Sequence, residues 1–411
     1  MVSLRNYFCQ LKEILKAQCV SYFVLLALSA FFILGWTVYA FLTRQEWVVP
    51  GLLALFLFSF IFQHLFLRKK CYVLFLFKVL ILIAFVIQIS WNIYDQVQIH
   101  PHQNGQYFQL ESTSPLGVSP QPNLRNNPIA FTIDKDTVNV VIISLDSARR
   151  RIPDDAFMEE YLANRHHPVK HAVFLGCSFT FGAGLMYSST FPYLFEKLNP
   201  DYKSYNYGVV GFGPHQIALL FDKRVNIINE SSISERDGFA LYSYIDDHLN
   251  RVYGGSVYLS WAYYPPNVFV ENDSLIIRKW PLFQRLNSRI LADVALLRYF
   301  DITINYPKSD DFYKRFADII NYTAKKYREL KPGNHFYVGI YPGQNKDLNW
   351  IQYLDEKIIV LKVTPPSDYD DKSKYQVNMY DHHPSKASNL YYAEELTRLI
   401  SEYESTNNNI L

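Results

Sequence analysis

The sequence predicts a membrane anchor of three helices followed by an α/β domain. Three observations lead to this prediction. Long apolar runs follow one another in residues 1–92, strand and helix patterns alternate from residue 171 onward, and a turn carrying a serine directly follows the first strand of that alternation. A chain of 411 residues has room for both parts.

The apolar runs cover residues 19–42, 47–67 and 71–91. Each reaches the roughly 20 residues that a helix needs to cross a hydrocarbon core. Lysine and arginine precede the first run and fill the turn at residues 68–70. Because positive charge favours the cytoplasmic side, we expect an integral membrane protein with a cytoplasmic N-terminus. Everything after residue 91 is then extracytoplasmic, in the periplasm if the membrane is a bacterial inner membrane.

Composition excludes several classes of protein. The 40 basic and 38 acidic residues leave a net charge of +2, so no basic footprint indicates a nucleic-acid partner. Three of the four cysteines lie in or beside the apolar region, so Cys177 has no partner for a disulfide in the rest of the chain. The histidine pairs at 166–167 and 382–383 lack metal-site spacing, so neither a metal nor a cofactor is expected.

Residues 93–170 are interpreted as a linker and short β region. Gln, Asn, Pro and Ser are frequent up to residue 128, and two short strands, possible as a hairpin, follow at 129–133 and 138–144. The three arginines at 149–151 are expected to form a solvated surface.

Residues 171–411 are expected to form the catalytic domain. Apolar side chains recur every three or four residues across 310–330, which predicts a helix that faces a core. Strands separated by helices indicate a parallel sheet with helices on both faces. Residues 252–280 break the alternation and are expected to be an insertion with short strands near the site. The other strands and helices are expected at His171–Gly176, Tyr202–Tyr207, Gly238–Ile245, His335–Tyr341 and Lys357–Val363, and at Thr190–Leu198, Pro214–Val225, Pro281–Leu297 and Pro384–Tyr403.

Three short segments could carry chemistry. Residues 176–182 read Gly-Cys-Ser-Phe-Thr-Phe-Gly and place Ser178 at the carboxyl edge of the sheet. A serine needs a base to take its proton and an acid to orient that base, and Asp381 and His383 supply both. The backbone N–H groups of Ser178 and of Gly211, in a glycine-rich turn after the second strand, could stabilise an oxyanion.

These segments resemble the conserved blocks of the SGNH/GDSL hydrolases. The first resembles Gly-Asp-Ser-x-Thr-x-Gly, the second the block whose glycine lines the oxyanion hole, and the third the block that supplies acid and base. The resemblance covers about residues 171–403, with the blocks in the family's order. It implies a three-layer α/β/α, flavodoxin-like fold and acyl transfer through acyl-Ser178, and the His-Pro step favours His383 over His382 as the base.

The sequence departs from the family pattern in three places. Cys177 stands where the family has aspartate and is an alternative nucleophile, although no neighbour is suited to activate a thiol. The acid and base are two residues apart, where the family often has three. The family's third block supplies an asparagine oxyanion donor, which residues 244–251 do not match. There His248 could donate instead, or Asn250 if the loop shifts, or His248 and Arg251 could simply tie down the loop.

The function expected from these residues is that of a membrane-anchored serine esterase. Its substrate would be an O-acyl ester, such as an acetyl ester, of cell-envelope carbohydrate or lipid. One alternative is a polysaccharide O-acyltransferase of the same fold, which would need a membrane acyl-donor protein as its partner. A second alternative is a catalytically silent binding or assembly protein, which the missing asparagine would suit.

Overall fold

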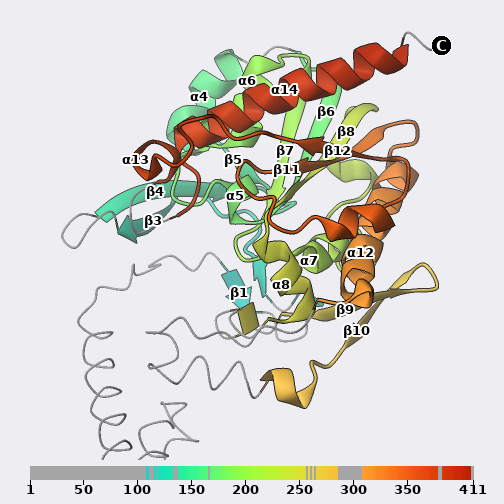
Figure 1. Cartoon of the computed structure of the whole chain (residues 1–411). Coiled ribbons are helices and arrows are strands. Elements are labelled where there is room, and N and C mark those ends of the chain that lie inside the picture. Colours follow the sequence, from blue (N-terminus) through green and yellow to red (C-terminus); the bar gives the residue numbers. More distant parts are fainter. Residues whose placement is uncertain are drawn as a thin grey trace, which may run out of the picture. The chain divides into compact units, whose positions relative to one another are not determined.

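A computed structural model describes most of the chain beyond the apolar runs (Figure 1). It describes residues 108–110, 115–116, 118–132, 138–164, 167–255, 258–259, 262, 265–285, 308–377 and 382–408. The three predicted membrane spans, Asp381 and most of the helix predicted at 281–297 lie outside these residues. Within the described part, no helix is both long enough and apolar enough to cross a bilayer.

A sheet of eight strands forms the centre of the described part. Its order is β12-β11-β8-β6-β7-β5-β4-β3. The first five of these strands run parallel to one another. Numbered along the chain, they stand in the order 5-4-3-1-2, which is the flavodoxin-like order with its switch point beside β6. The parallel strands are β6 (Lys170–Gly176), β7 (Tyr202–Gly208), β8 (Asp237–Tyr244), β11 (His335–Ile340) and β12 (Ile358–Lys362).

An antiparallel extension continues the sheet beyond β7. The hairpin predicted at 129–133 and 138–144 is confirmed as β3 (Asn127–Thr132) and β4 (Val138–Leu145). The short strand β5 (Arg151–Ile152) joins this hairpin to β7. Strands β3, β4 and β5, which all precede residue 170, therefore belong to the central sheet, and the sequence did not predict this.

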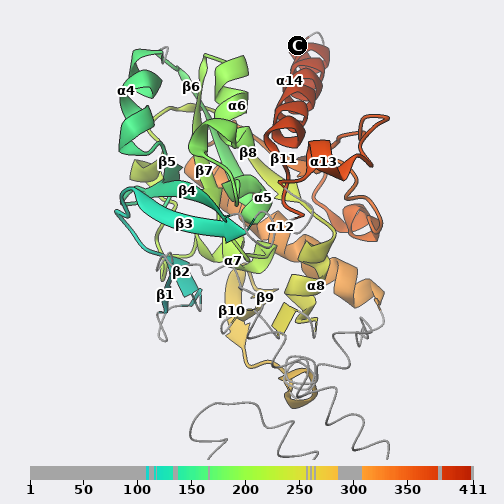
Figure 2. The ribbon, with the colours of Figure 1, turned by 90° about the vertical axis from the view of Figure 1, so that its left-hand side faces the viewer.

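Each face of the sheet is covered by helices. Along β6, Ala172 and Phe174 point to one core, and Val173 and Leu175 point to the other, as the two-residue period of a strand requires. Figures 1 and 2 show α6 and α14 on the first face and α7, α8 and α12 on the second. The predicted arrangement of helices on both faces is confirmed. The bounds are α6 Phe191–Leu198, α7 Pro214–Leu219, α8 Asp247–Tyr253, α12 Asp310–Leu330 and α14 Lys386–Asn408.

Helix α12 shows how the sequence specifies these elements. Ser309 caps its first turn by accepting a hydrogen bond from the backbone N–H of Phe312, and two aspartates follow where the helix dipole favours negative charge. Its buried stripe includes Phe316 and Ile320. The helix spans the predicted residues 310–330.

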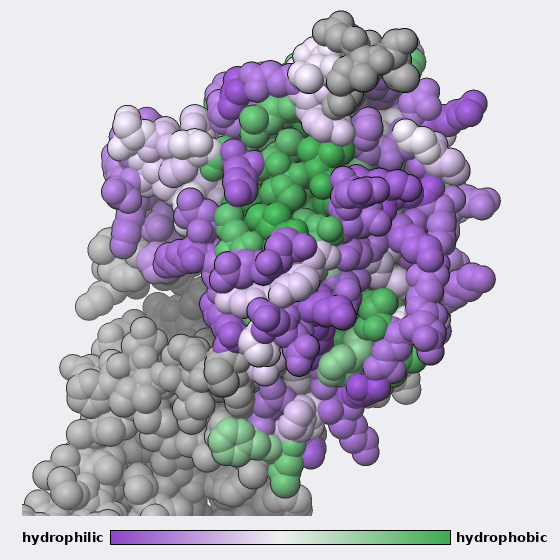
Figure 3. Space-filling model, turned by 45° about the vertical axis from the view of Figure 1, so that its right-hand side comes forward, coloured by the Kyte–Doolittle hydropathy of each residue, from purple (hydrophilic) through white to green (hydrophobic). Residues whose placement is uncertain are grey.

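Smaller elements complete the described part. A separate antiparallel hairpin, β9 (Asn267–Glu271) with β10 (Ser274–Arg278), lies in the predicted insertion, and β1 (Phe108–Leu110) pairs with β2 (Val118–Pro120). Hydrophilic side chains cover most of the described face in Figure 3, with one large hydrophobic area and smaller ones below it. The remaining helical elements are α4 (Asp155–Ala163), α5 (Ser178–Phe181), α13 (Lys372–Tyr375), and three 3₁₀ turns at Tyr187–Ser189, Glu230–Ser232 and Asn349–Tyr353.

Candidate active site

Ser178 stands at the carboxyl end of the strand beside the switch point. Strand β6 lies between β7 and β8 and ends at Gly176, and Ser178 is the first residue of the single-turn helix α5. Ser178 is largely buried, with 5% of the residue exposed, whereas Cys177 is 0% exposed and packs into the core under α6 and α14. The geometry therefore favours Ser178 over Cys177 as the residue that a substrate could reach.

Backbone conformation requires the glycine that precedes the serine turn. Gly176 has a φ of +159°, and a Cβ there would lie 2.2 Å from Oγ1 of Thr180. Gly208 has the same role on the next strand, because a Cβ there would lie 2.3 Å from the backbone nitrogen of Phe181. Strand β7 thus approaches α5 as closely as glycine permits.

Asn206 fastens α5 to β7. Its Nδ2 donates to the carbonyl of Thr180 at 3.1 Å and lies 3.5 Å from that of Phe181. Its Oδ1 accepts from the backbone N–H of Gly208 at 2.9 Å. The side chain is buried, so this asparagine orients the serine turn rather than contacting solvent.

The turn after β7 carries Gly211, the predicted oxyanion donor. Gly211 has a φ of +81°, in the left-handed region that favours glycine. The turn is closed by a hydrogen bond from Phe212 N–H to the carbonyl of Val209, and Val209 N–H donates in turn to the carbonyl of Gly176. Arg251 of α8 donates from Nη1 to the carbonyl of Phe212 at 2.8 Å. Arg251 therefore does tie down a loop, and that loop is the one that carries Gly211.

His248 lies at the start of α8, after the neighbouring strand β8. Its imidazole is fully buried, with Nδ1 2.6 Å from the hydroxyl of Tyr242. Burial, with Arg251 and His215 nearby, holds the pKa of His248 well below its usual value, so the ring is neutral. Among the described residues, its Nε2 has no hydrogen-bond partner. His248 accordingly stays a candidate for the third oxyanion donor.

The acidic residues beside His248 are held by other groups. Asp246 accepts hydrogen bonds from the backbone N–H of Lys346, in the loop after β11. Asp247 pairs with Nε of Arg251 at 2.8 Å. Asn250 is exposed on α8. Neither carboxylate needs to face an oxyanion, because each has a partner of its own.

The segment before α14 brings His383 to the serine turn. The ring of His383 packs edge to face against Phe179, the residue after Ser178, with centroids 5.7 Å apart. His382 instead is exposed, and its Nδ1 lies 3.0 Å from Oε1 of Gln376. The backbone of His383 is held by a hydrogen bond from Val377 N–H to its carbonyl. The packing favours His383 as the base; the predicted acid, Asp381, lies outside the described residues.

His215 is a buried histidine that sequence reasoning missed. It lies in α7, directly after the turn that carries Gly211, and neither of its ring nitrogens has a hydrogen-bond partner among the described residues. Burial, together with Arg315 and Arg251, holds the pKa of His215 well below its usual value. The imidazoles of His215 and His248 are therefore both neutral.

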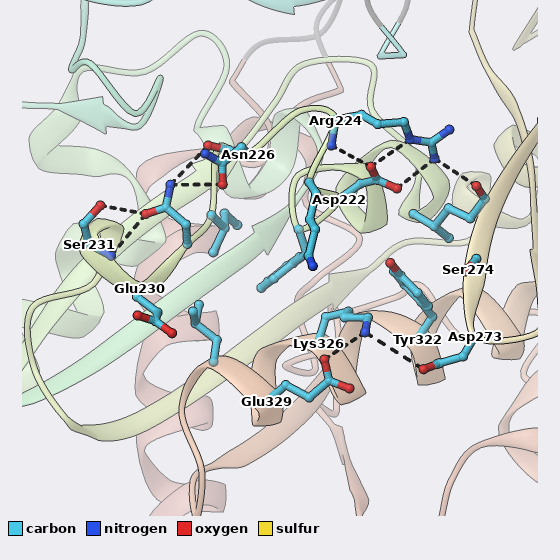
Figure 4. Close-up of a pocket in the computed structure, with 16 residues that line it drawn as sticks. Asp222, Arg224, Asn226, Glu230, Ser231, Asp273, Ser274, Tyr322, Lys326 and Glu329 are labelled. Atoms are coloured by element: carbon cyan, nitrogen blue, oxygen red, sulfur yellow. Dashed lines mark hydrogen bonds and ion pairs between the residues drawn. The ribbon is translucent and has the colours of Figure 1, made fainter.

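A pocket of ≈ 1040 Å³ lies elsewhere (Figure 4). It is lined by the loop that leads into β8 and by the end of α12 that leads into β11, so it lies at the opposite end of the sheet from Ser178. Its charges neutralise one another: Arg224 holds Asp222 through bonds of 2.8 and 2.7 Å, and Lys326 holds Glu329 at 2.8 Å. It has no serine–histidine pair, so it is not the candidate active site. Within the described ranges, no group of His, Cys, Asp and Glu is arranged to hold a metal ion.

The strand order and the position of the serine turn are those that the sequence resemblance implied. The fold is a flavodoxin-like sheet with helices on both faces. No protein-family model matches the sequence, and no curated protein matches it either. Solved structures do match, at low identity, and those described next are named as G-D-S-L lipolytic proteins or carbohydrate esterases.

An acetyl xylan esterase, Est2A, from Butyrivibrio proteoclasticus is 13% identical, with 59% of this chain and 66% of that chain covered and a TM-score of 0.37. A putative lipolytic protein of the G-D-S-L family from Desulfitobacterium hafniense is 12% identical, with 56% and 99% covered and a TM-score of 0.31. A carbohydrate esterase family 2 enzyme from Corynascus thermopiles is 12% identical, with 65% and 70% covered and a TM-score of 0.33. These likenesses are distant, and the function proposed below rests on this chain's own residues.

Proposed function

We propose that this chain is an SGNH-type serine esterase. One observation carries the proposal: Ser178 opens a single-turn helix at the end of the strand beside the switch point, and the ring of His383 packs against the next residue, Phe179. Residues far apart in the sequence thus supply a nucleophile and a base to one end of the sheet, where α/β proteins bind their ligands.

In the proposed reaction, Oγ of Ser178 attacks the acyl carbonyl carbon while His383 takes the hydroxyl proton. Asp381 would orient His383 and stabilise its charged form. The tetrahedral intermediate then expels the substrate alcohol, which receives the proton from His383, and leaves acyl-Ser178. Water attacks this ester in a second step with the same base, and releases the free acid and the serine.

Backbone N–H groups would stabilise the negative oxygen of each intermediate. Ser178 and Gly211 offer two, from α5 and from the turn after β7, and Nε2–H of His248 is proposed as the third donor. One donor of this kind contributes about 2.7–4 kcal/mol to the transition state. Because Arg251 holds the Gly211 turn and Asn206 holds α5, these donors are set before the substrate binds.

For the substrate, we propose an O-acyl ester of cell-envelope carbohydrate or lipid. The support is in the sequence: three apolar runs of membrane-spanning length precede the described part, and the charge pattern favours a position of that part outside the cytoplasm. A membrane-anchored esterase in that position meets envelope esters.

The test is hydrolysis of p-nitrophenyl acetate by the full-length chain, beside Ser178→Ala and Cys177→Ala. We expect turnover to be lost in Ser178→Ala and kept in Cys177→Ala, the matched control one residue away. Loss in Cys177→Ala alone would make the thiol the nucleophile. No turnover in the folded wild type would contradict the esterase proposal. Acyl release measured with and without a sugar acceptor separates hydrolysis from acyl transfer.

A further inference from the structure

We propose that Arg151 is a positioning residue for the ester-cleaving serine. Its guanidinium holds the carboxyl end of the helix that Ser178 opens. This inference rests on the proposed function, because it assigns Arg151 a role in presenting the nucleophile. It also corrects an expectation from the sequence: the run 149–151 was predicted to be a solvated surface, and that was wrong for Arg151, which is 2% exposed.

The guanidinium of Arg151 donates hydrogen bonds to three backbone carbonyls. Nη1 donates to the carbonyl of Phe181 at 2.8 Å and to that of Gly182 at 2.5 Å. Nη2 donates to the carbonyl of Leu185. The guanidinium carbon also lies 4.7 Å from the centroid of the Phe181 ring, a cation–π contact. One cation therefore binds the last residue of α5 and the turn that follows it.

These carbonyls need a partner outside the helix. The last C=O groups of any helix have no partner within it, and α5 has only four residues. So short a helix gains little from cooperative hydrogen bonding. A buried cation at its carboxyl end satisfies the carbonyls and also compensates their partial negative charge. The conformation of α5 therefore depends on its surroundings, and Arg151 is a large part of them.

Asn206 contacts carbonyls of the same short helix from the adjacent strand, and shares that of Phe181 with Arg151. Arg151 and Asn206 face each other in the register of β5 and β7. Residues directly opposite in an antiparallel pair project to the same face of the sheet. Asn206 bonds to the carbonyl of Thr180, and Phe181 O lies within reach of both side chains. The two residues thus form one clamp on α5.

The clamp on residues 181–185 affects the position of Ser178 because hydrogen bonds connect these residues back to Ser178. The backbone N–H groups of Gly182 and Ala183 both donate to the carbonyl of Ser178, at 2.9 and 3.0 Å. A shift of the held carbonyls is therefore transmitted to the serine. In other enzymes a misplacement of about 1 Å at a reacting group costs on the order of 100-fold in rate.

The experiment compares Arg151→Met and Arg151→Lys with Arg150→Met in the full-length chain. Arg150 is the matched control: it is the adjacent residue, pairs with Asp146 at 2.6 Å, and donates to the carbonyl of Ser232 instead of α5. Two quantities are measured. The first is the rate constant for reaction of Ser178 with a fluorophosphonate, per folded protein. The second is hydrogen–deuterium exchange in the peptides that cover residues 178–185.

We expect Arg151→Met to react with the fluorophosphonate about 10- to 100-fold more slowly and to exchange faster in residues 178–185. Arg151→Lys keeps the charge but not the fork of donors, so its rate should fall between wild type and Arg151→Met. Arg150→Met should match the wild type in both measurements. If Arg151→Met does not fold, Arg151→Lys decides by the same two readouts.

Two results would overturn the inference. Wild-type exchange in a folded Arg151 variant would show that the guanidinium does not hold α5. Faster exchange with an unchanged reaction rate would show that the clamp does not position the serine. If the wild type itself fails to react with the fluorophosphonate, the proposed function fails, while exchange in residues 178–185 still decides whether the clamp exists.

Discussion

The hydroxyl of Tyr242 lies 2.6 Å from Nδ1 of His248, and both side chains are fully buried. The backbone N–H of Ile245 also points at Nδ1, at 3.4 Å. Because an N–H can only donate, Nδ1 is the acceptor and the ring proton is on Nε2. The backbone N–H of Ile245 therefore selects the tautomer that a neutral oxyanion donor requires, and the hydroxyl of Tyr242 supports it by donating to Nδ1.

Replacing His248 tests that role. We expect His248→Leu to lower kcat by about 100- to 1,000-fold with little change in KM, which is the cost of losing one oxyanion donor. Steady-state kinetics with p-nitrophenyl acetate measures both constants. Tyr242→Phe is the companion variant: it removes the partner of Nδ1, and should lower kcat less and stability by about 1 kcal/mol. A folded His248→Leu protein with wild-type kcat would show that His248 is not an oxyanion donor and that its role is to hold the loop in place.

Arg251 should stabilise the Gly211 turn more through its hydrogen bond than through its ion pair. Arg251→Met leaves the buried carbonyl of Phe212 without this donor, so we expect a loss of about 1–3 kcal/mol in the free energy of unfolding. Asp247→Asn breaks the ion pair alone, and Asp247 is half exposed, so its cost should be under about 1 kcal/mol. Urea unfolding measures both. Equal losses in the two variants would contradict this ranking.

Gly208 should tolerate no side chain. In Gly208→Ala the new Cβ would meet the backbone of Thr180 and Phe181, at 2.7 and 2.3 Å, so α5 has to move. We expect a folded protein of reduced stability whose Ser178 reacts at least about 10-fold more slowly with a fluorophosphonate. The control is Gly255→Ala, where the nearest atom would be 3.4 Å away, an ordinary contact. Wild-type reactivity in Gly208→Ala would mean that α5 is not fixed by its contact with β7.

His171 should make the domain less stable in mild acid. Burial, and secondarily Lys331, lowers the pKa of His171 to about 4, from 6.5 in the unfolded chain. Between these values the unfolded chain binds a proton that the folded chain does not, so stability falls as the pH drops from 6.5 to 4 and is unaffected above that window. The loss from this residue is at most about 3 kcal/mol.

His171→Gln removes the titration while keeping a polar partner for the hydroxyl of Tyr327, which lies 2.7 Å from Nε2. We expect the variant to lose less stability than the wild type between pH 6.5 and 4, as measured by urea unfolding at several pH values. An identical pH dependence in the two proteins would show that His171 is not a source of the acid sensitivity.

Periodicity in the sequence was enough to place most of the fold. Val173 and Phe174 lie on opposite faces of β6, as the alternating cores require, and the apolar stripe at 310–330 became α12 with the predicted bounds. The serine turn was visible because glycine, serine and a preceding apolar strand are adjacent in the sequence. Local patterns of this kind survive folding because neighbouring residues produce them.

Contacts between distant residues could not be predicted in the same way. In the sequence, Arg151 is one of three adjacent arginines expected at the surface. It is buried beside α5 only because β5 pairs with β7, which lies more than fifty positions later in the chain. The sequence likewise gave no sign that Ile245 and Tyr242 would both contact Nδ1 of His248 and so set its tautomer. Both depend on which side chains the tertiary structure brings together, which neither spacing nor composition encodes.

The antiparallel extension has a practical consequence for dissecting the protein. A recombinant fragment that begins at His171, the start of the strand–helix alternation, would lack β5. Such a fragment would expose the edge of β7 that β5 covers, and an exposed strand edge promotes aggregation. It would also leave the carbonyls of Phe181 and Gly182 without the hydrogen bonds from the Arg151 guanidinium. A fragment has to start before Arg151 to keep the guanidinium, and at or before Asn127 to keep the whole antiparallel extension.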